Sequence, residues 1–477
     1  MARSRNRARD TELRMLVFAV ALCLFGYALV GYAVDDRLPD GFFTVGGGLA
    51  VLAGVAHLAV RKFAPYADPL ILPVTTTLSG LGLVLIHRLD LSYKDTYNSP
   101  PAAGGQVMWT VIGVTAFTIL LAVLRDYRLL QRYVYITALV ALVLLMAPAF
   151  FPGDTYGAKR WIRAGALSFQ PGEFVKIIIT VFFAAYLTMQ RDALALTGRR
   201  IWGIHLPRGR QLGPIVTVWV FSLLVLVFER DLGTSLIFFG VFVAVLYIAT
   251  ERTGWVLFGL LMAALGAAVV GSYEPHVHGR VVAWLHPFDY YLPPGQRPAG
   301  LVSDQAAQAL FSFGSGGILG TGLGRGHSEL IAFAGRSDFI ITAVGEELGL
   351  AGMMAVLLLY LLLAQRGLRT ALEAGDAFGK LLAAGLACAL VFQVFVVVGG
   401  VTGLMPLTGK ALPFLAQGGS SVVANWLVMA LLVRISDGAR RPQPKPGPAG
   451  GIVRSPTPSA PRGTPLPGPA ERPPAAC

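Results

Sequence analysis

The sequence has few charged residues for its length. Of 477 residues, 14% are charged and 55% are hydrophobic, whereas a soluble protein has about a quarter charged residues. Cysteine is also scarce, because Cys23, Cys388 and Cys477 are the whole set; they allow no disulfide framework and no metal-ligand spacing. The first hydrophobic run is long and lacks a small-residue cleavage site, so we expect no cleavable signal peptide. This composition excludes a soluble enzyme.

Hydrophobic runs fill most of the chain instead. Many of them reach the 17–25 residues, roughly, that cross a bilayer. We therefore predict an all-α, polytopic membrane protein with about twelve transmembrane helices. The predicted spans are 14–34, 42–60, 69–88, 106–124, 133–151, 170–189, 213–228, 233–250, 255–272, 338–363, 381–403 and 415–435.

The net charge of +13 reports topology rather than nucleic-acid binding. If both termini are cytoplasmic, the basic clusters between the spans fall on the cytoplasmic side, as the positive-inside rule requires. We expect no nucleic-acid partner. These clusters are Arg3, Arg5, Arg7 and Arg9; Arg61 and Lys62; Arg125, Arg128 and Arg132; Arg199, Arg200, Arg208 and Arg210; Arg366, Arg369 and Lys380; and Arg434, Arg440 and Arg441.

Breaks in hydrophobicity divide the chain. Residues 1–62 hold a cytoplasmic stub and the first two spans, and residues 63–441 hold the rest of the transmembrane region. Within that region, a loop at 89–105 and a longer one at 273–337 are expected to be extracytoplasmic, and long loops are commonly functional. Residues 442–477 are rich in Pro, Gly, Ser and Ala, which predicts a disordered cytoplasmic tail.

One predicted external loop breaks the charge rule. Residues 152–169 carry Lys159, Arg160 and Arg163. Charge bias in short loops is statistical, so this is either a tolerated exception or a basic pocket for an anionic group such as a lipid-linked phosphate.

Four sets of residues together resemble one family. The first is G-A-K-R-W-I followed by F-Q-P-G-E-F-V-K, at 157–176, and the second is D-L-G-T at 231–234. The third is the glycine-rich stretch 316–324 leading into S-D-F-I at 337–340 and G-E-E-L-G at 345–349. The fourth runs from Gly403 to Ser421. In this order they resemble the SEDS family (shape, elongation, division and sporulation), typified by RodA and FtsW.

The resemblance implies a fold, an activity and a partner. The family core has ten helices, three of them before the Q-P-x-E helix, whereas five precede it here; the first two then form an added pair, similar to the actinobacterial RodA-type branch. The implied activity is a peptidoglycan glycosyltransferase that polymerises lipid II at the outer face of the cytoplasmic membrane. The implied partner is a class B penicillin-binding protein. No cofactor is certain, although a divalent cation (Mg or Mn) would suit pyrophosphate chemistry.

The resemblance also implies a catalytic base in the long loop. The family has a pattern like W-L-x-P-x-x-D-P, and this chain reads Trp284 to Tyr291 as W-L-H-P-F-D-Y-Y, with the aspartate one position early and no following proline. Asp289 is therefore the favoured base, and Asp304 is the alternative. Gln305 and Gln308 match two glutamines of the pattern and are assigned to substrate binding. Loss or relocation of the base in this chain remains open.

Other polar residues are candidates for the substrate pocket. Lys159, Arg160 and Trp161 precede the sixth span; an arginine matches phosphate oxygens with two parallel hydrogen bonds, and Arg280 is a second candidate of this kind. Contact with lipid headgroups is the alternative for both arginines. Glu173 and Lys176 are three residues apart on a helix and are expected to pair. That polar face continues to Gln170 and either lines the substrate cavity or is only structural.

A last group is assigned to the pocket structure. Asp231 is expected to cap the eighth span, and Asp338 belongs to the third motif. Glu346 and Glu347 differ by about 100° around a helix, so we expect at most one to be functional and the other to pack against a polar partner. Gly418, Gly419 and Ser420 open the last span, where glycines permit close helix approach and hydroxyls can cap. The glycines at 316–326 favour close packing or flexibility, since no Gly-Lys-Ser/Thr follows as in a nucleotide loop.

Two other functions stay open. A lipid II flippase would also carry buried polar residues in many helices, although the polar residues here gather in the predicted outer half. A scaffold that has lost catalysis and recruits a penicillin-binding protein is also compatible with the altered region around Asp289.

Overall fold

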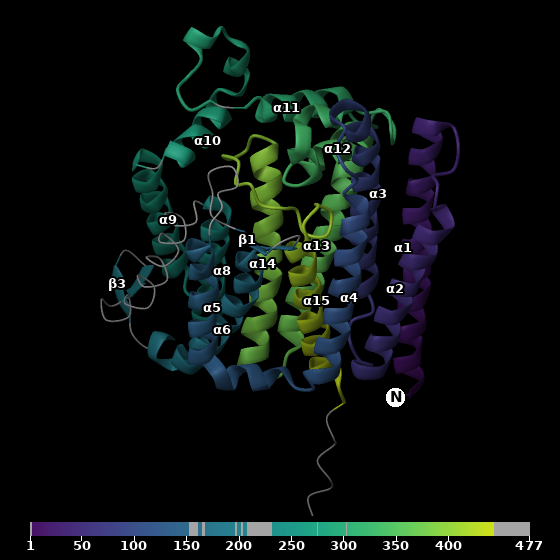
Figure 1. Cartoon of the computed structure of the whole chain (residues 1–477). Helices are drawn as coiled ribbons and strands as arrows, with labels where there is room; N and C mark the ends of the chain where they lie inside the picture. The colour runs from purple at the N-terminus through teal and green to yellow at the C-terminus, as the bar shows by residue number, and fades with distance from the viewer. Residues whose placement is uncertain are drawn as a thin grey trace, which may run out of the picture. The chain divides into compact units, whose positions relative to one another are not determined.

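The computed structural model describes residues 2–151, 161–164, 167–195, 198–201, 204–207, 231–273, 275–301 and 303–442. Residues 1–440 form one compact unit and 441–477 a second. The first unit is built of helices that run side by side (Figure 1). They are α1 (Ala2–Asp35), α2 (Phe42–Phe63), α3 (Ile71–Tyr97), α4 (Ala103–Val123), α5 (Val134–Met146), α6 (Pro171–Ala195), α8 (Leu232–Thr250), α9 (Thr253–Tyr273), α10 (Pro275–Leu285), α11 (Gln305–Gly316), α12 (Ile340–Glu347), α13 (Gly349–Glu373), α14 (Ala377–Val401) and α15 (Gly419–Arg440).

Short elements join these helices. Two antiparallel hairpins pair β1 (Ile162–Ala164) with β2 (Leu167–Phe169) and β3 (Gly198–Ile201) with β4 (Ile204–Pro207). The 3-10 helices are η1 (Tyr127–Tyr133), η2 (Ala147–Phe150), η3 (Pro287–Tyr291), η4 (Pro294–Gln296) and η5 (Ser328–Arg336).

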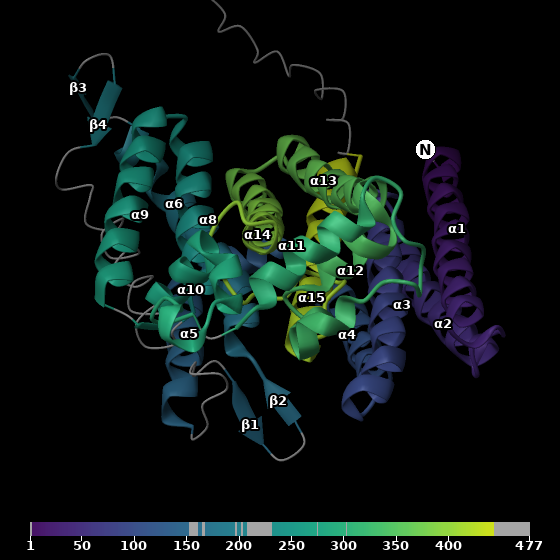
Figure 2. The same cartoon turned by 90° about the horizontal axis from the view of Figure 1, so that it is seen from above.

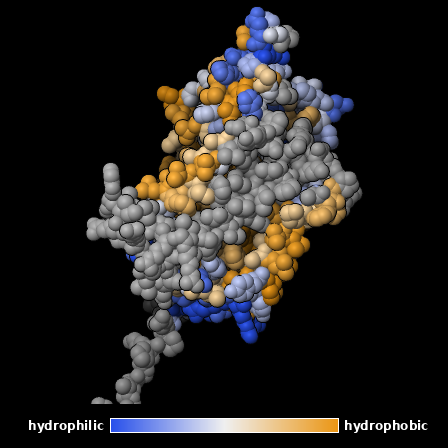
Figure 3. All heavy atoms as spheres, turned by 90° about the vertical axis from the view of Figure 1, so that its left-hand side faces the viewer, coloured by the Kyte–Doolittle hydropathy of each residue, from blue (hydrophilic) through white to orange (hydrophobic). Residues whose placement is uncertain are grey.

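The helices confirm a polytopic membrane protein. Within the described residues, ten are long and apolar enough to cross a membrane. The predicted span 255–272 corresponds to α9, and the predicted span 213–228 lies outside the part that the structure describes. On the face shown in Figure 3, hydrophobic residues gather between polar ends of the bundle. Exposed side chains such as Leu139 of α5 and Leu261 of α9, 59% and 65% exposed, fit contact with lipid.

Three predicted boundaries were wrong. The span 338–363 is two helices, because Gly349 has φ +67° and the chain turns there. A side chain at Gly349 would overlap the backbone of Ile318 and Gly320, so glycine is required by both conformation and space. Helix α3 continues to Tyr97, which shortens the predicted loop 89–105. The last span begins at Gly419 rather than at 415.

The predicted long loop contains regular structure. Helices α10 and α11 and the 3-10 helices η3 to η5 occupy residues 275–336, and α10 and α11 lie across one end of the bundle (Figures 1 and 2). We call this end the loop end. The loop end thus places the predicted catalytic residues on short helices rather than on an irregular segment.

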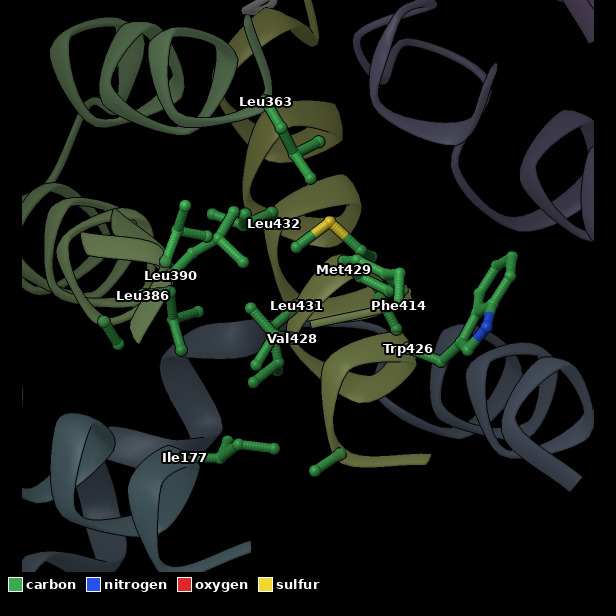
Figure 4. Close-up of a cluster of buried hydrophobic side chains, with 14 of the residues drawn as sticks. Ile177, Leu363, Leu386, Leu390, Phe414, Trp426, Val428, Met429, Leu431 and Leu432 are labelled. Carbon is green, nitrogen blue, oxygen red and sulfur yellow. The ribbon is translucent and has the colours of Figure 1, made fainter. Parts of the chain in front are cut away.

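The core is centred on α15. Its side chains pack against leucines of α13 and α14, against Ile177 of α6 and against Phe414 (Figure 4). Of the 18-residue apolar window in α15, 89% is buried, compared with 17% for α5. In a membrane such packing is held by van der Waals contact and interhelical hydrogen bonds, because lipid is as apolar as the helix surface. Buried polar pairs therefore contribute strongly to which helices associate.

Helix α1 is fixed to the bundle by one of these pairs. Arg9 is 1% exposed, although the sequence suggested only a topology signal at this position. Its guanidinium lies 2.5 Å from Glu12, whose other oxygen lies 2.7 Å from Nδ1 of His57 in α2. Arg9 also donates to the carbonyl of Ala67. The added N-terminal pair is therefore connected to the start of α3 through buried charge.

Candidate active site

Glu173 and Lys176 form the predicted ion pair. Helix α6 begins at Pro171, which suits the first position of a helix, and Glu173 lies in the first turn, where the helix dipole favours a negative charge. Nζ of Lys176 is 3.2 Å from Oε2 of Glu173. The two side chains are 6% and 2% exposed, and such burial of charge is tolerated only with partners.

Further partners come from distant parts of the chain. Lys176 donates to Oε1 of Gln393 in α14 at 2.5 Å and to Oδ1 of Asn425 in α15 at 3.2 Å. Nζ of Lys410 lies 3.1 Å from Oε1 of Glu173. Each oxygen of the Glu173 carboxylate therefore has its own ammonium group.

Asp231 joins this group through the N-terminus of α8. It is the N-cap residue, and its carboxylate accepts from the backbone N–H of Thr234 at 3.0 Å and from the Thr234 hydroxyl at 2.7 Å. This confirms the predicted cap. Nζ of Lys410 lies 3.5 Å from Oδ2 of Asp231 and donates to Oγ1 of Thr234 at 2.8 Å. We call Glu173, Lys176, Asp231 and Lys410 the buried charge cluster.

The buried charge cluster lies close to the loop end. Glu173 is in the first turn of α6 and Asp231 caps α8, while Gln393 lies eight residues before the end of α14 and Asn425 six residues after the start of α15. At 1.5 Å per residue, the two amides are about 12 Å and about 9 Å from those helix ends. The cluster therefore lies within about 12 Å of these helix ends.

Sequence reasoning missed three members of this arrangement. Lys410, Gln393 and Asn425 each interrupt an apolar stretch, in T-G-K-A-L, V-F-Q-V-F and V-A-N-W. A polar residue inside an apolar span is expensive and usually has a role. That signal was present, but only the structure shows that all three converge on the Glu173–Lys176 pair.

The start of α15 adjoins the entrance of α6. The backbone N–H of Gln170 donates to Oγ of Ser420 at 2.9 Å, so this hydroxyl receives a bond from another segment. Gly418 donates its N–H to Gln106 at 3.1 Å. A side chain at Gly419 would overlap the ring of Trp109. The predicted close approach is thus found at Gly419.

The two candidate bases have different surroundings at the loop end. Asp289 lies in η3 with its side chain 37% exposed, and Nδ1 of His286 is 3.4 Å from its Oδ2. Asp304 accepts from Nε2 of Gln308 at 3.3 Å and from the hydroxyl of Tyr291 at 3.4 Å. Partial burial, together with the Asp304 carboxylate, raises the pKa of the Tyr291 phenol. Asp304 is therefore engaged in holding η3 on α11, while Asp289 is the more available carboxylate.

The structure describes some of the predicted substrate-binding residues, namely Gln305, Gln308 and Trp161. Gln308 donates to the hydroxyl of Tyr291 at 3.0 Å, and the backbone N–H of Gln305 is 3.2 Å from Oγ of Ser303. Trp161 is half-buried. Lys159 and Arg160 lie outside the described residues, so the predicted basic pocket remains a prediction.

Helix α10 rests on the segment between α14 and α15. Nη1 of Arg280 donates to the carbonyl of Leu407 at 3.0 Å, and Nε1 of Trp284 donates to the carbonyl of Gly403 at 2.7 Å. This segment, residues 402–418, also carries Lys410. At least one N–H of Arg280 therefore supports backbone rather than a ligand.

Glu346 and Glu347 support the glycine-rich loop together. Glu346 accepts from the N–H of His327 at 2.8 Å and from Oγ of Ser328 at 2.6 Å. Glu347 accepts from the N–H of Gly324 at 2.9 Å and pairs with Arg88 at 2.8 Å. Both side chains pack against polar partners, because the loop passes around the end of α12 and reaches both; that at most one of them is functional remains a prediction.

The remaining pocket residues also have packing roles. Asp338 is half-buried and accepts from Oγ of Ser337 at 2.8 Å. Several glycines of the stretch 316–326 pack closely; a side chain at Gly316, for example, would overlap the carbonyl of Gly345. In the part of the chain that the structure describes, no three His, Cys, Asp or Glu side chains converge as metal ligands. We therefore assign no step to a divalent cation.

Comparison with known proteins places this geometry in a family. Residues 69–441 match the cell cycle protein family of FtsW, RodA and SpoVE. The chain belongs to this family. It is 46% identical, over 91% of its length and 92% of the relative, to the peptidoglycan glycosyltransferase RodA of Mycobacterium tuberculosis. This agrees with the predicted actinobacterial RodA-type branch.

Two solved structures share the fold. The rod shape determining protein RodA of Thermus thermophilus matches with a TM-score of 0.54 at 21% identity, covering 79% of this chain and 98% of that one. A chain from a solved peptidoglycan synthase complex, described as structurally coordinating polymerization and crosslinking, matches with a TM-score of 0.52 at 23% identity. This match covers 84% of the present chain and 98% of the other.

Proposed function

We propose that this protein is a peptidoglycan glycosyltransferase that polymerises lipid II at the outer face of the cytoplasmic membrane. The observation that carries the proposal is 46% identity, over more than nine-tenths of both chains, to a relative that bears this name. The geometry supports it, because the chain carries a partly exposed carboxylate, Asp289, at the loop end and a buried charge cluster near the helix ends below the loops.

The reaction needs a base and a leaving group. Asp289 takes the proton from the sugar 4-hydroxyl of one lipid II while that oxygen attacks the anomeric carbon of the other. The new glycosidic C–O bond replaces the C–O bond to pyrophosphate, and undecaprenyl pyrophosphate leaves. Lys159 and Arg160 are proposed to balance its charge, since guanidinium groups match phosphate oxygens. Gln305, Gln308 and Trp161 are proposed to contact the substrate.

A partner is part of the proposal. A class B penicillin-binding protein would crosslink the strands that this protein makes. One structural relative belongs to a synthase complex that coordinates polymerization and crosslinking, and this supports such a pairing. We infer that membrane lipids surround the exposed leucines of α5 and α9 and that nucleic acid is no partner.

The test is polymerisation of purified lipid II by the protein with its partner. We expect Asp289→Ala to lower the rate by about 10²–10⁴-fold, the usual contribution of a general base, and Asp304→Ala to lower it less. Asp40→Ala is the control, because this carboxylate is 88% exposed in the α1–α2 loop; it should leave the rate unchanged.

The outcomes separate the alternatives. Full activity in both Asp289→Ala and Asp304→Ala would disprove the assigned base. A wild-type protein without polymerase activity that moves lipid II between the leaflets of a liposome would be a flippase. A wild-type protein that does neither but binds the penicillin-binding protein would be a scaffold.

A further inference from the structure

Lys410 is the one charged residue in the segment between α14 and α15, residues 402–418. Its side chain is 3% exposed. Its ammonium group contacts Glu173 of α6 at 3.1 Å and both Asp231 and Thr234 of α8, at 3.5 and 2.8 Å. One side chain therefore connects the starts of two transmembrane helices to a non-helical segment.

The start of α8 is shaped to admit this lysine. A side chain at Gly233 would overlap Cγ of Lys410 and lie 3.2 Å from Cβ of Thr408. Only glycine leaves room for the aliphatic stem of Lys410 to cross the first turn of α8. Three residues of the D-L-G-T motif thus accommodate Lys410. Asp231 forms an ion pair with its ammonium group, Gly233 leaves space for its stem, and Thr234 accepts its hydrogen bond.

The N-terminal part of the segment 402–418 contacts α10 at the loop end. The carbonyls of Gly403 and Leu407 accept from Trp284 and Arg280 of α10. Asp289 follows α10 within four residues, in η3. A short path therefore leads from the buried charge cluster through Lys410 and the backbone of 403–410 to α10, and from α10 to Asp289.

We propose that Lys410 is a positioning residue for the glycosyl transfer, which fixes α10 and η3, and with them Asp289, at the loop end. The proposal has two parts. The structural part states that Lys410 holds α10 in place, and the kinetic part states that this placement is needed for turnover. Only the kinetic part rests on the proposed function. Because correct placement of a base relative to its substrate is worth about 10²-fold for a displacement near 1 Å, loss of this tie should reduce turnover.

The structural part is tested by hydrogen–deuterium exchange of the full-length protein in lipid nanodiscs. Lys410→Met removes the ammonium group and keeps the stem. Arg434→Met is the matched control, because Arg434 is 4% exposed and bonds Asp437 and the carbonyl of Phe63, away from α10. We expect faster exchange at 275–291 in Lys410→Met and not in Arg434→Met. No change in Lys410→Met, or equal changes in both variants, would overturn the proposal.

The kinetic part uses lipid II polymerisation. We expect Lys410→Met to lower kcat by about 10²-fold with little change in KM. Lys410→Met combined with Asp231→Asn removes, together with the ammonium group, the charge of one carboxylate that it contacts, while asparagine keeps the helix cap, so thermal stability should recover in part and kcat should not. Recovery of kcat together with stability would show a merely structural role and overturn the proposal. An inactive wild type would refute the proposed function, and the exchange experiment would still decide the role of Lys410.

Discussion

Replacing Glu173 by glutamine should destabilise the bundle by more than any surface ion pair does. The carboxylate lies between two ammonium groups, at 3.2 Å from Lys176 and 3.1 Å from Lys410, and all three side chains are 6% exposed or less. Removing one partner from a buried ion pair costs about 3–5 kcal/mol. Lys176 keeps Gln393 and Asn425 as acceptors, so we expect Glu173→Gln to cost about 3 kcal/mol, the lower end of that range.

The matched control is an exposed pair at the opposite end of the bundle. Arg128 lies 3.0 Å from Asp376, and the two side chains are 58% and 26% exposed. Exposed pairs contribute about 0.2–1 kcal/mol, so Arg128→Gln should cost no more than that. Both variants are compared by reversible unfolding in mixed detergent and dodecyl sulfate micelles, which gives the free energy of unfolding directly.

A double-mutant cycle completes the test. With Glu173→Gln and Lys410→Met together, one cation is removed with its anion, so the double variant should be less destabilised than the sum of the single variants. Additive costs would show that the two side chains do not interact. A cost for Glu173→Gln no larger than that for Arg128→Gln would refute our account of the buried charge cluster.

Two further predictions concern the loop end and the turn before α14. Gly320 has φ +82°, and a side chain there would overlap the carbonyl of Glu347, whereas Gly317 has φ +53° and open space around it. Gly320→Ala should therefore lower the thermal unfolding temperature clearly more than Gly317→Ala, which has only the conformational cost of its backbone, φ 53° and ψ −137°, about 1–3 kcal/mol; equal shifts would contradict the packing. Burial raises the pKa of Asp376, but bonds from Tyr127, the N–H of Gly379 and Arg128 outweigh it, so the pKa is lowered from 3.8. Its stabilisation is present above pH 3.8 and lost as pH falls through the folded pKa, so Asp376→Asn should be less stable than wild type at about pH 7 and equal to it well below that folded pKa; a difference that persists in acid would show another cause.

Much of the fold could be predicted because a transmembrane span is recognisable from the hydrophobicity of consecutive residues. Apolar runs such as 381–403 correspond to α14 within a few residues, since every residue of a membrane helix must be compatible with lipid or packing. The break at Gly349 could not be predicted in this way. The run 338–363 stays apolar across it, and the turn is imposed by contact with the backbone of Ile318 and Gly320, some 30 positions earlier in the sequence.

The candidate site was predictable only where its residues are neighbours in sequence. Glu173 and Lys176 are three positions apart, so helical periodicity alone pairs them. Lys410 is 176 positions from Thr234, and nothing in the local pattern states that they meet. Glu346 and Glu347 are the opposite case. Helical geometry points their side chains in different directions, but the loop at 324–328 contacts both.

Lys410, one of the residues that sequence reasoning missed, lies in the non-helical segment between α14 and α15. Backbone that is not helical can be accommodated beside membrane helices only where protein or a water-filled cavity covers it. The middle part of this segment, residues 408–416, meets this condition, because Thr408, Lys410 and Leu412 are all at most 3% exposed, and Gln393 donates to the carbonyl of Ala411 at 2.9 Å. A non-helical segment has no hydrophobic periodicity from which its contacts could be predicted. Here, two backbone carbonyls of the segment bind α10, and its one charged residue binds α6 and α8. In a protein whose helices meet lipid, such a covered and irregular segment can bring polar groups together, and we therefore expect changes in its sequence to alter activity as well as stability.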